Sequence, residues 1–289
     1  MSDICCSAKT LYVIDLDGTL LRDDKTISET TVSILNDLIC CGSMITYATA
    51  RTIKSASALT RDIAFSLPVI LRNGTILADP QTKQELEIAI FSEEALQIIR
   101  KHLQAPKLKN LAVSGFVTSF IDHQEYKSYR NDTISEGFRL YLNDHTNDLR
   151  LRHVTTEEAL YEGDVCYFTF ISDRESLDPL YEMVKDGTEW VCVYQEDKYH
   201  PGCFWLEICP KAATKAQAIR KLQARLGCDR LVVFGDSLND ISMFEIADEA
   251  YAVANAEACL KEIATDVIGD NQQDGVARWL KEEFLIRKY

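Results

Sequence analysis

The protein is a chain of 289 residues with 45 acidic and 31 basic side chains, which gives it a net charge of −14. A surface this acidic repels nucleic acids and anionic membranes, so neither kind of partner is expected. No apolar run approaches the roughly 18–20 residues of a membrane span, and residues 1–10 lack the apolar core of a signal peptide. A cytoplasmic location is therefore expected.

The first 75 residues alternate predicted strands and helices. The apolar run at residues 11–14 ends at Asp15 and predicts a strand buried on both faces. A helix capped by Ser28 follows, and residues 44–49 and 69–71 predict two further strands. Such alternation is typical of a doubly wound sheet.

The middle of the chain has a different pattern. Helices are expected at residues 93–103 and 177–185, and strands at 167–171 and 190–194. This mixture predicts an α+β domain inserted into the α/β domain.

The last 85 residues return to the first pattern. A helix is expected at residues 215–226 with Gly227 as its stop, followed by a buried strand at 231–234. Two short strands are expected near residues 251–253 and 267–268. The predicted fold class is therefore α/β: a Rossmann-like, doubly wound parallel sheet of residues 1–80 and 206–289, with an inserted α+β domain at 81–205.

The ten cysteines are expected to be reduced, because a chain of this length buries a large core without disulfide bridges. A zinc site built from His200, Cys203 and Cys209 is an alternative interpretation, although the spacing fits no zinc finger or ribbon.

Acidic residues follow two of the predicted strands. Asp15 and Asp17 come after the first strand, and Asp236 and Asp240 come after the strand at 231–234. Ligands bind beyond the carboxyl ends of parallel strands, and several carboxylates gathered there need a cation. Mg²⁺ is the natural partner of such oxygen ligands. The plainer alternative is that these acids cap turns and helices.

These segments resemble the motifs of the haloacid dehalogenase superfamily of aspartate-nucleophile phosphatases. Residues 15–20 (DLDGTL) are similar to its first motif, residues 48–51 (ATAR) to its second, and residues 235–240 (GDSLND) to its fourth. Lys215 stands where the third motif has its lysine. Residues 72–74 (RNG) and 274–277 (DGVA) resemble signatures of the Cof-type subfamily, whose α+β cap is inserted between the second and third motifs.

The resemblance implies roles for the residues that match. Asp15 would be the nucleophile that forms an aspartyl-phosphate, and Asp17 would be the general acid and base. Mg²⁺ would be held by the Asp15 and Asp236 carboxylates and the backbone carbonyl of Asp17. Lys215 and Thr49 would bind the non-bridging phosphate oxygens.

Four further residues are implied around the phosphate. Asp240 would orient Lys215 or a metal-bound water, and Asn239 would donate to the phosphate or to Asp15. Arg51 and Asn73 either contact the substrate or have a structural hydrogen-bonding role. Substrate selectivity is expected from the cap, in residues 126–139 or 194–205.

Two departures from the family pattern concern glycine. Ala50 stands where the family usually has glycine, and the usual Gly-Val-Ser-Lys-Gly around the lysine is here Ala-Ala-Thr-Lys-Ala at residues 212–216. Without glycine, positive φ is harder to reach, so the loop before Lys215 is expected to differ in shape.

The expected function is a Mg²⁺-dependent phosphatase that hydrolyses a small phosphorylated metabolite, either a sugar phosphate or a cofactor phosphate, through an aspartyl-phosphate. One alternative is a phosphomutase, which shares the intermediate but returns the phosphoryl group to a sugar. Another is a non-catalytic sensor that binds a phosphorylated ligand.

Overall fold

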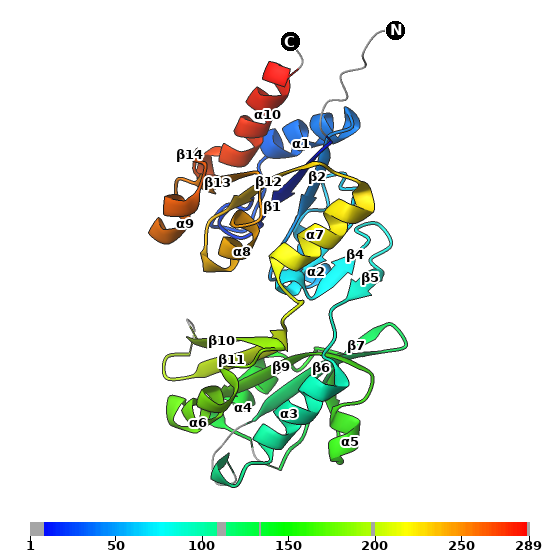
Figure 1. The fold of residues 1–289 in the computed structure, drawn as a ribbon, viewed down its shortest axis with the longest axis vertical. Coiled ribbons are helices and arrows are strands. Elements are labelled where there is room, and N and C mark those ends of the chain that lie inside the picture. The colour runs from blue at the N-terminus through cyan, green and yellow to red at the C-terminus, as the bar shows by residue number, and fades with distance from the viewer. Residues whose placement is uncertain (1–8, 109–113, 133, 198–199, 288–289) are drawn as a thin grey trace. The chain divides into compact units, whose positions relative to one another are not determined.

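The computed structural model describes residues 9–108, 114–132, 134–197 and 200–287 (Figure 1). The chain forms two compact units, one within residues 9–87 and 213–287 and the other within residues 88–212. The first contains a parallel sheet and the second a sheet of its own. The predicted fold class, an α/β core with an inserted α+β domain, is confirmed.

The first unit is built on a five-stranded sheet in the order β14-β13-β12-β1-β2, in which all neighbours are parallel. The strands are β1 (Thr10–Ile14), β2 (Met44–Tyr47), β12 (Arg230–Gly235), β13 (Glu249–Val253) and β14 (Asp266–Ile268). Every residue of β1 is buried, as the unbroken apolar run predicts for a central parallel strand.

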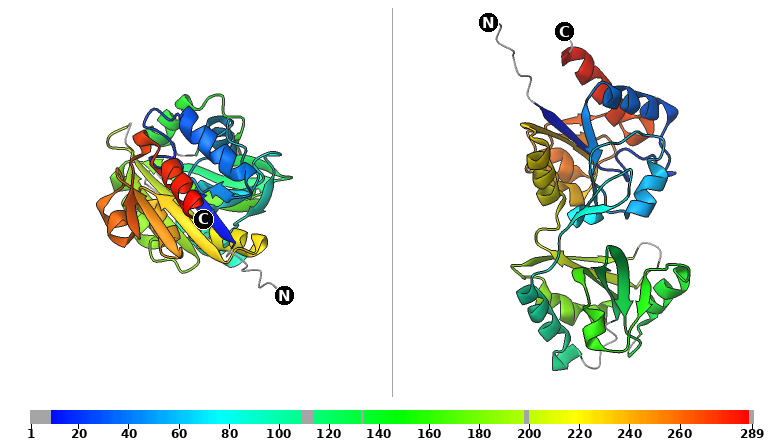
Figure 2. Two further views of the ribbon diagram at one scale, coloured as in Figure 1. Left: turned by 90° about the horizontal axis from the view of Figure 1, so that it is seen from above. Right: turned by 90° about the vertical axis from the view of Figure 1, so that its right-hand side faces the viewer.

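Helices cover both faces of this sheet. Figure 2 shows α1 (Glu29–Cys40) and α10 (Gly275–Arg287) on one face and α7 (Lys215–Leu226) on the other. The predicted caps are present: the Ser28 side chain accepts from the amide of Thr31, and Gly227 ends α7 with φ +62°. The shorter helices are α2 (Ile53–Leu59), α8 (Ile241–Phe244) and α9 (Ala258–Ile263), and the 3₁₀ turns are η1 (Arg72–Gly74), η3 (Leu238–Asp240) and η4 (Asn271–Gln273).

The strand predicted at residues 69–71 exists, but it pairs differently from the others. It is β3 (Val69–Leu71), and it runs antiparallel to β4 (Ile76–Ala78) in a three-stranded sheet that ends with β5 (Glu85–Ile88). A single parallel bridge, from Ala48 to Ile70, links it to the strand before it. The turn η1 between β3 and β4 is therefore held directly beside the end of β2.

The second unit is built on a six-stranded sheet in the order β10-β11-β9-β6-β7-β8, antiparallel except for the β7–β8 pair. Its strands are β6 (Gly115–Ile121), β7 (Gln124–Tyr129), β8 (Leu151–His153), β9 (Asp164–Ser172), β10 (Trp190–Glu196) and β11 (Phe204–Pro210). Its helices are α3 (Glu93–Leu103), η2 (Pro106–Leu108), α4 (Glu136–Asp144), α5 (Glu157–Leu160) and α6 (Arg174–Val184).

Both faces of the central strands β6 and β9 are packed. Val117 and Phe168 belong to a cluster with side chains of α3 and α6, among them Ile99 and Leu177. Phe116 and Ile171 alternate with those strand residues and pack instead with Phe138 and Tyr141 of α4. The interiors of both strands are buried throughout, which explains their long apolar runs.

A partly buried cluster of ion pairs lies near the edge of this sheet. The Lys127 ammonium donates to the Tyr141 hydroxyl at 2.6 Å and to Asp148 Oδ2 at 3.1 Å. Arg150 contacts both oxygens of Asp148 at 2.7 Å and pairs with Glu125 at 3.2 Å. Two cations thus face two carboxylates, and these four groups are balanced in charge.

No helix in the described ranges combines the length and the apolarity that crossing a membrane requires. The eight cysteines outside residues 1–8 form no disulfide bond with one another.

Candidate active site

Two acids lie side by side because the strands that precede them are neighbours. In the register of β1 and β12, Ile14 is opposite Phe234, and the amide of Asp15 donates to the Phe234 carbonyl at 3.0 Å. Asp15 follows β1 directly, and Asp236 follows β12 directly. Both carboxylates are therefore at the carboxyl edge of the parallel sheet, where α/β proteins bind their ligands.

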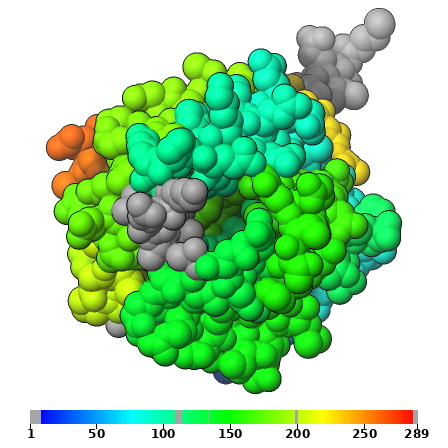
Figure 3. All heavy atoms as spheres, turned by 90° about the horizontal axis from the view of Figure 1, so that it is seen from below, coloured from blue at the N-terminus to red at the C-terminus, as the bar shows by residue number. Residues whose placement is uncertain are grey.

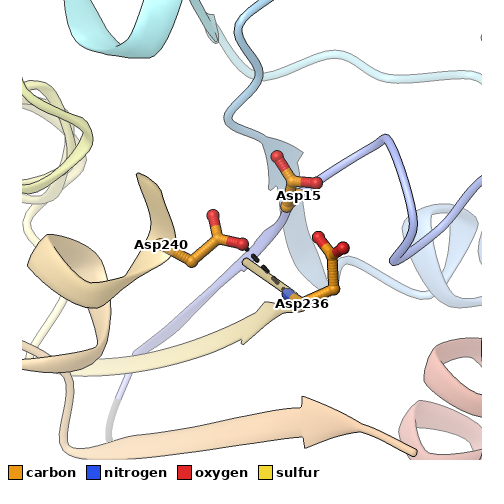
Figure 4. A group of neighbouring side chains, drawn as sticks. All are labelled: Asp15, Asp236 and Asp240. Carbon is orange, nitrogen blue, oxygen red and sulfur yellow. Dashed lines mark hydrogen bonds between the residues drawn. The ribbon is translucent and has the colours of Figure 1, made fainter. Parts of the chain in front are cut away.

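Asp15, Asp236 and Asp240 form a cluster of carboxylates. One oxygen of each lies within 4.8 Å of the others, and Figure 4 shows the three side chains converging. Asp240 belongs to η3, the turn that follows β12, and its side chain is fully buried. Sequence reasoning named these three acids, but the contact between them is seen only in the structure.

Lys215 connects the acids. Its ammonium donates to Asp15 Oδ1 at 2.5 Å and to Asp240 Oδ1 at 2.6 Å, and its side chain is fully buried. Burial alone would lower the pKa of Lys215, but the negative charges of Asp15 and Asp240 raise it above its ordinary value. The lysine therefore stays charged inside the core.

Asp240 is held from its other side by backbone amides. Its Oδ2 accepts from the amides of Asp236 at 3.0 Å and Ser237 at 3.2 Å. A Cβ at Gly235 would stand 2.7 Å from the Asp240 carboxylate, so only glycine leaves room for this approach. Lys215 holds one oxygen of Asp240 and two amides hold the other, so the Asp240 carboxylate is fixed in place and in turn holds Lys215.

The donor set fits a divalent cation. When all are ionised, Asp15, Asp236 and Asp240 carry three negative charges against the one positive charge of Lys215, an excess of two negative charges. Burial raises the pKa of Asp236 to about 6, and the charge of Asp240 adds to the rise. Burial likewise raises the pKa of Asp15, with Asp240 and Asp236 contributing. A hard cation such as Mg²⁺ would supply the missing charge.

The positions of Asp15 and Asp236 suit metal ligation better than that of Asp240. Oδ2 of Asp15 and Oδ2 of Asp236 make no hydrogen bond within the described part of the chain, whereas both oxygens of Asp240 are engaged. A cation could therefore bind these two carboxylate oxygens and nearby backbone oxygens.

The loop after β1 is packed tightly against Asp236. A Cβ at Gly18, where φ is +80°, would lie 2.3 Å from Asp236 Oδ2. The hydroxyl of the next residue, Thr19, donates to Asp236 Oδ1 at 3.2 Å. The glycine of the Asp-x-Asp-Gly segment is thus needed for both its backbone angle and its small size.

Asp17 lies outside the cluster. Its carboxylate forms a two-point contact with Arg51, with 2.7 Å from Nε to Oδ2 and 2.5 Å from Nη2 to Oδ1. About half of the Asp17 side chain is exposed. The sequence placed Asp17 beside Asp15 as the acid and base, and the structure shows which residue holds it.

Thr49, Asn73 and Asn239 lie around the same edge. Thr49 follows β2 and is fully buried; its hydroxyl accepts from the Arg51 amide at 3.2 Å, and its carbonyl accepts from the Asn73 amide at 3.0 Å. Asn73 has φ +54° within η1, and its side-chain oxygen accepts from Asn239 Nδ2 at 3.2 Å. Asn239 is therefore linked to Asn73, with the Ser237 hydroxyl donating to its side-chain oxygen at 2.7 Å.

The three alanines that stand where the family usually has glycine, at residues 50, 212 and 216, do not have positive φ. Thr214 caps α7 by accepting from the Gln217 amide at 3.2 Å, which places Lys215 at the first position of the helix. The glycine needed here is Gly74, with φ +104°, because a Cβ there would meet the Thr214 carbonyl at 2.2 Å.

The alternative zinc site is not formed. Over the described ranges, the three aspartates are the one group of His, Cys, Asp or Glu side chains close enough to share an ion. His200 instead lies 3.6 Å from Asp197 Oδ2 and 3.7 Å from Asp144 Oδ2.

Sequence reasoning missed the asparagines that anchor the loop after Asp17. Asn255 donates to the Gly18 carbonyl at 2.7 Å and accepts from the Asn271 amide at 3.1 Å. Asn271 is buried and donates to the Leu21 carbonyl at 2.9 Å. The contacts with Gly18 and Leu21 each join residues more than 200 positions apart in the sequence, and only the position of Asn255 just after a strand pointed to such a role.

Both stretches expected to set selectivity line cavities within the second unit. One cavity of about 320 Å³ lies between α3, β6 and α5, and includes Arg130 and Asp132; the hollow is visible in Figure 3. Another of about 290 Å³ includes Asp197, His200 and Trp205. The structure thus gives each stretch a concave surface.

Fold and site together define an α/β enzyme with an acid-rich centre at the carboxyl edge of its parallel sheet. The family of haloacid dehalogenase-like hydrolases matches residues 12–280 of the chain. The chain therefore belongs to this family.

Relatives of known name support the same assignment. The 5-amino-6-(5-phospho-D-ribitylamino)uracil phosphatases YitU and YwtE of Bacillus subtilis are 28% and 24% identical over 283 and 290 residues, each alignment covering 96% of this chain and 98% of the relative. A crystal structure from Thermotoga maritima matches with a TM-score of 0.70 and 26% identity, over 96% of this chain and 97% of that one. The expected Cof-type phosphatase family and the class of phosphoric monoester hydrolases are confirmed.

Proposed function

We propose that this enzyme is a Mg²⁺-dependent phosphomonoesterase that attacks a small phosphorylated metabolite with the carboxylate of Asp15. The observation that carries the proposal is the buried contact of 2.5 Å between the Lys215 ammonium and Asp15 Oδ1, beside the unpaired Oδ2 of Asp236 in the described structure. One oxygen of Asp15 would hold Mg²⁺, and the other would act as the nucleophile once Lys215 contacts the phosphate oxygens instead.

The reaction would proceed in two displacements. An Asp15 oxygen attacks phosphorus, the bond to the leaving oxygen breaks, and Asp17 gives that oxygen a proton. A water then attacks the phosphorus of the aspartyl-phosphate, Asp17 takes the proton of the water, and the Asp15–phosphorus bond breaks. Lys215 and the Thr49 hydroxyl stabilise the non-bridging oxygens. Asp15, Asp236 and the Asp17 carbonyl would hold Mg²⁺, which would supply charge neutralisation.

The names of two relatives support a proposal for the substrate class. YitU and YwtE are named for a phosphorylated ribitylamino-uracil. We infer that this chain accepts a sugar phosphate or a cofactor-like phosphate of similar size, and that the unit within residues 88–212 acts as the cap that selects it. We also propose that the protein is located in the cytoplasm, because such metabolites occur there and cysteines stay reduced there.

The direct test is phosphate release from a panel of phosphorylated metabolites and p-nitrophenyl phosphate, with Mg²⁺ and then with a chelator. Metal-dependent release that is abolished in Asp15→Asn, with the circular dichroism spectrum unchanged, is the expected result. Retention of most activity in that variant rules out the covalent mechanism. Binding of a phosphorylated ligand without release would favour the sensor, and transfer to a second sugar would favour the mutase.

A further inference from the structure

The guanidinium group of Arg51 makes contacts within the protein that binding of substrate would not require. Its Nε and Nη2 bind the two oxygens of Asp17, and its Nη1 donates to the Ser55 hydroxyl at 2.8 Å. All three guanidinium nitrogens therefore have a protein partner. Two-point pairing of arginine with a carboxylate fixes the plane and orientation of the carboxylate, which a lysine cannot do.

The arginine is itself held at both ends. Its amide donates to the Thr49 hydroxyl at 3.2 Å and its carbonyl accepts from the Arg72 amide at 3.2 Å. Ser55 lies in the first turn of α2, a helix capped by Thr52. About a fifth of the Arg51 side chain is exposed, against about half of Asp17. The more exposed acid is thus tied to a less exposed, anchored arginine.

We propose that Arg51 is the positioning residue of Asp17, holding its carboxylate in the orientation in which it takes the proton from the water that hydrolyses the aspartyl-phosphate. The inference rests on the proposed function. Each carboxylate oxygen has two acceptor sites, and the contact with Arg51 uses one on each oxygen. One site on each oxygen stays available to the water, so the pair can persist while Asp17 acts as base.

The step needs no further reactant. Water oxygen forms a bond to phosphorus, the bond from phosphorus to the Asp15 oxygen breaks, and the water proton goes to Asp17. Phosphate and free Asp15 result. Asp17 then carries the proton that the next leaving oxygen receives. Loss of Arg51 is expected to slow this second displacement more than the first, so the aspartyl-phosphate should accumulate.

The experiment is rapid mixing of Arg51→Ala with p-nitrophenyl phosphate and Mg²⁺, following p-nitrophenol and phosphate separately. We expect a burst of p-nitrophenol approaching one per active site, then a kcat lowered by about 10–100-fold with KM unchanged or lower. Arg51→Lys should recover only part of kcat, because an ammonium makes a single-point contact. Ser55→Ala should give a smaller change of the same kind.

Arg61→Ala is the matched control, since Arg61 is largely exposed and its ion pair, with Asp62, is also exposed. Its kinetics should equal those of the wild type. A raised KM without a burst in Arg51→Ala would mean that Arg51 binds substrate phosphate, and unchanged kinetics would mean that it has neither role; either result overturns the inference. Failure of the proposed function looks different: the wild type itself would release nothing, or Asp15→Asn would remain active.

Discussion

Each unit of the protein buries a lysine against an aspartate, and the two clusters differ in charge balance. In the second unit, Lys127 and Arg150 face Asp148 and Glu125, so the positive and negative charges are equal. In the first unit, the described cluster joins three carboxylates to one cation, Lys215, which is paired with two of them. A balanced cluster is complete as it stands and serves stability. An unbalanced one retains unmet charge, which is the condition for binding a cation and a reactant.

Replacing Lys215 should affect both activity and stability, whereas a merely structural lysine would affect stability alone. Lys215→Met leaves Asp15 and Asp240 buried without a cation, so we expect a loss of kcat of about 10³-fold or more and a free energy of unfolding lower by about 3–5 kcal/mol. Phosphate release and urea unfolding measure the two effects. Mg²⁺ should restore part of the stability, because it supplies charge to the same acids. An active Lys215→Met enzyme would contradict the assignment.

The tight approach of Gly18 to Asp236 gives a second test. In Gly18→Ala the new Cβ would displace the Asp236 carboxylate, so we expect kcat to fall by about 100-fold. Gly42→Ala is the matched control: Gly42 also has positive φ, at +90°, but its Cβ would contact nothing within 4 Å. It should lower stability by about 1 kcal/mol and leave kcat unchanged. Equal kinetics for the two variants would show that the position of Asp236 does not matter.

The balanced cluster should affect stability alone. Lys127→Met keeps contact with the rings of Phe116 and Tyr141 but removes the hydrogen bonds to Tyr141 and Asp148. Because Arg150 still pairs with Asp148, the expected loss is about 1–3 kcal/mol in the free energy of unfolding. The kcat for p-nitrophenyl phosphate should not change. A large fall in kcat would assign the cluster a part in the reaction.

The smallest expected effect is a dependence on acid pH. Burial raises the pKa of Asp148, but the bonds from Arg150 and the charge of Lys127 outweigh it, so the pKa in the folded protein lies below its ordinary value. A depressed carboxyl pKa stabilises the fold above the unfolded pKa of about 3.9, and the stabilisation is lost as pH falls below it. Asp148→Asn should therefore destabilise at pH 7 and differ less from the wild type near pH 3, measured by urea unfolding. A constant difference would contradict this.

Much of the fold was predictable because the signals are local. The run at residues 11–14 predicted a fully buried strand, and Ser28 and Gly227 marked helix ends where the structure has them. The pairing of β3 was not predictable. Whether Val69–Leu71 joins the parallel sheet or pairs with β4 depends on the turn at residues 72–74, whose positive φ at Arg72 and Asn73 the residue types do not announce.

The family motifs led to Asp15, Asp236, Asp240 and Lys215, while their contacts required the fold. Lys215 and Asp15 are 200 residues apart in the chain, and the 2.5 Å between their atoms results from where α7 begins and how β1 and β12 pair. The two-point contact of Arg51 with Asp17 has no sequence signal, because both residue types are common on surfaces.

The sequence by itself determined the class of enzyme and the acids at the strand ends, since strand periodicity, capping and a chain of ordered motifs are properties of short segments. Only the tertiary structure decided that Lys215 is shared between two acids and that Asp17 pairs with Arg51 outside the cluster. It also decided that Gly18 packs against Asp236 and Gly74 against Thr214. The physical reason is that charge balance and close packing depend on distances between residues far apart in the chain.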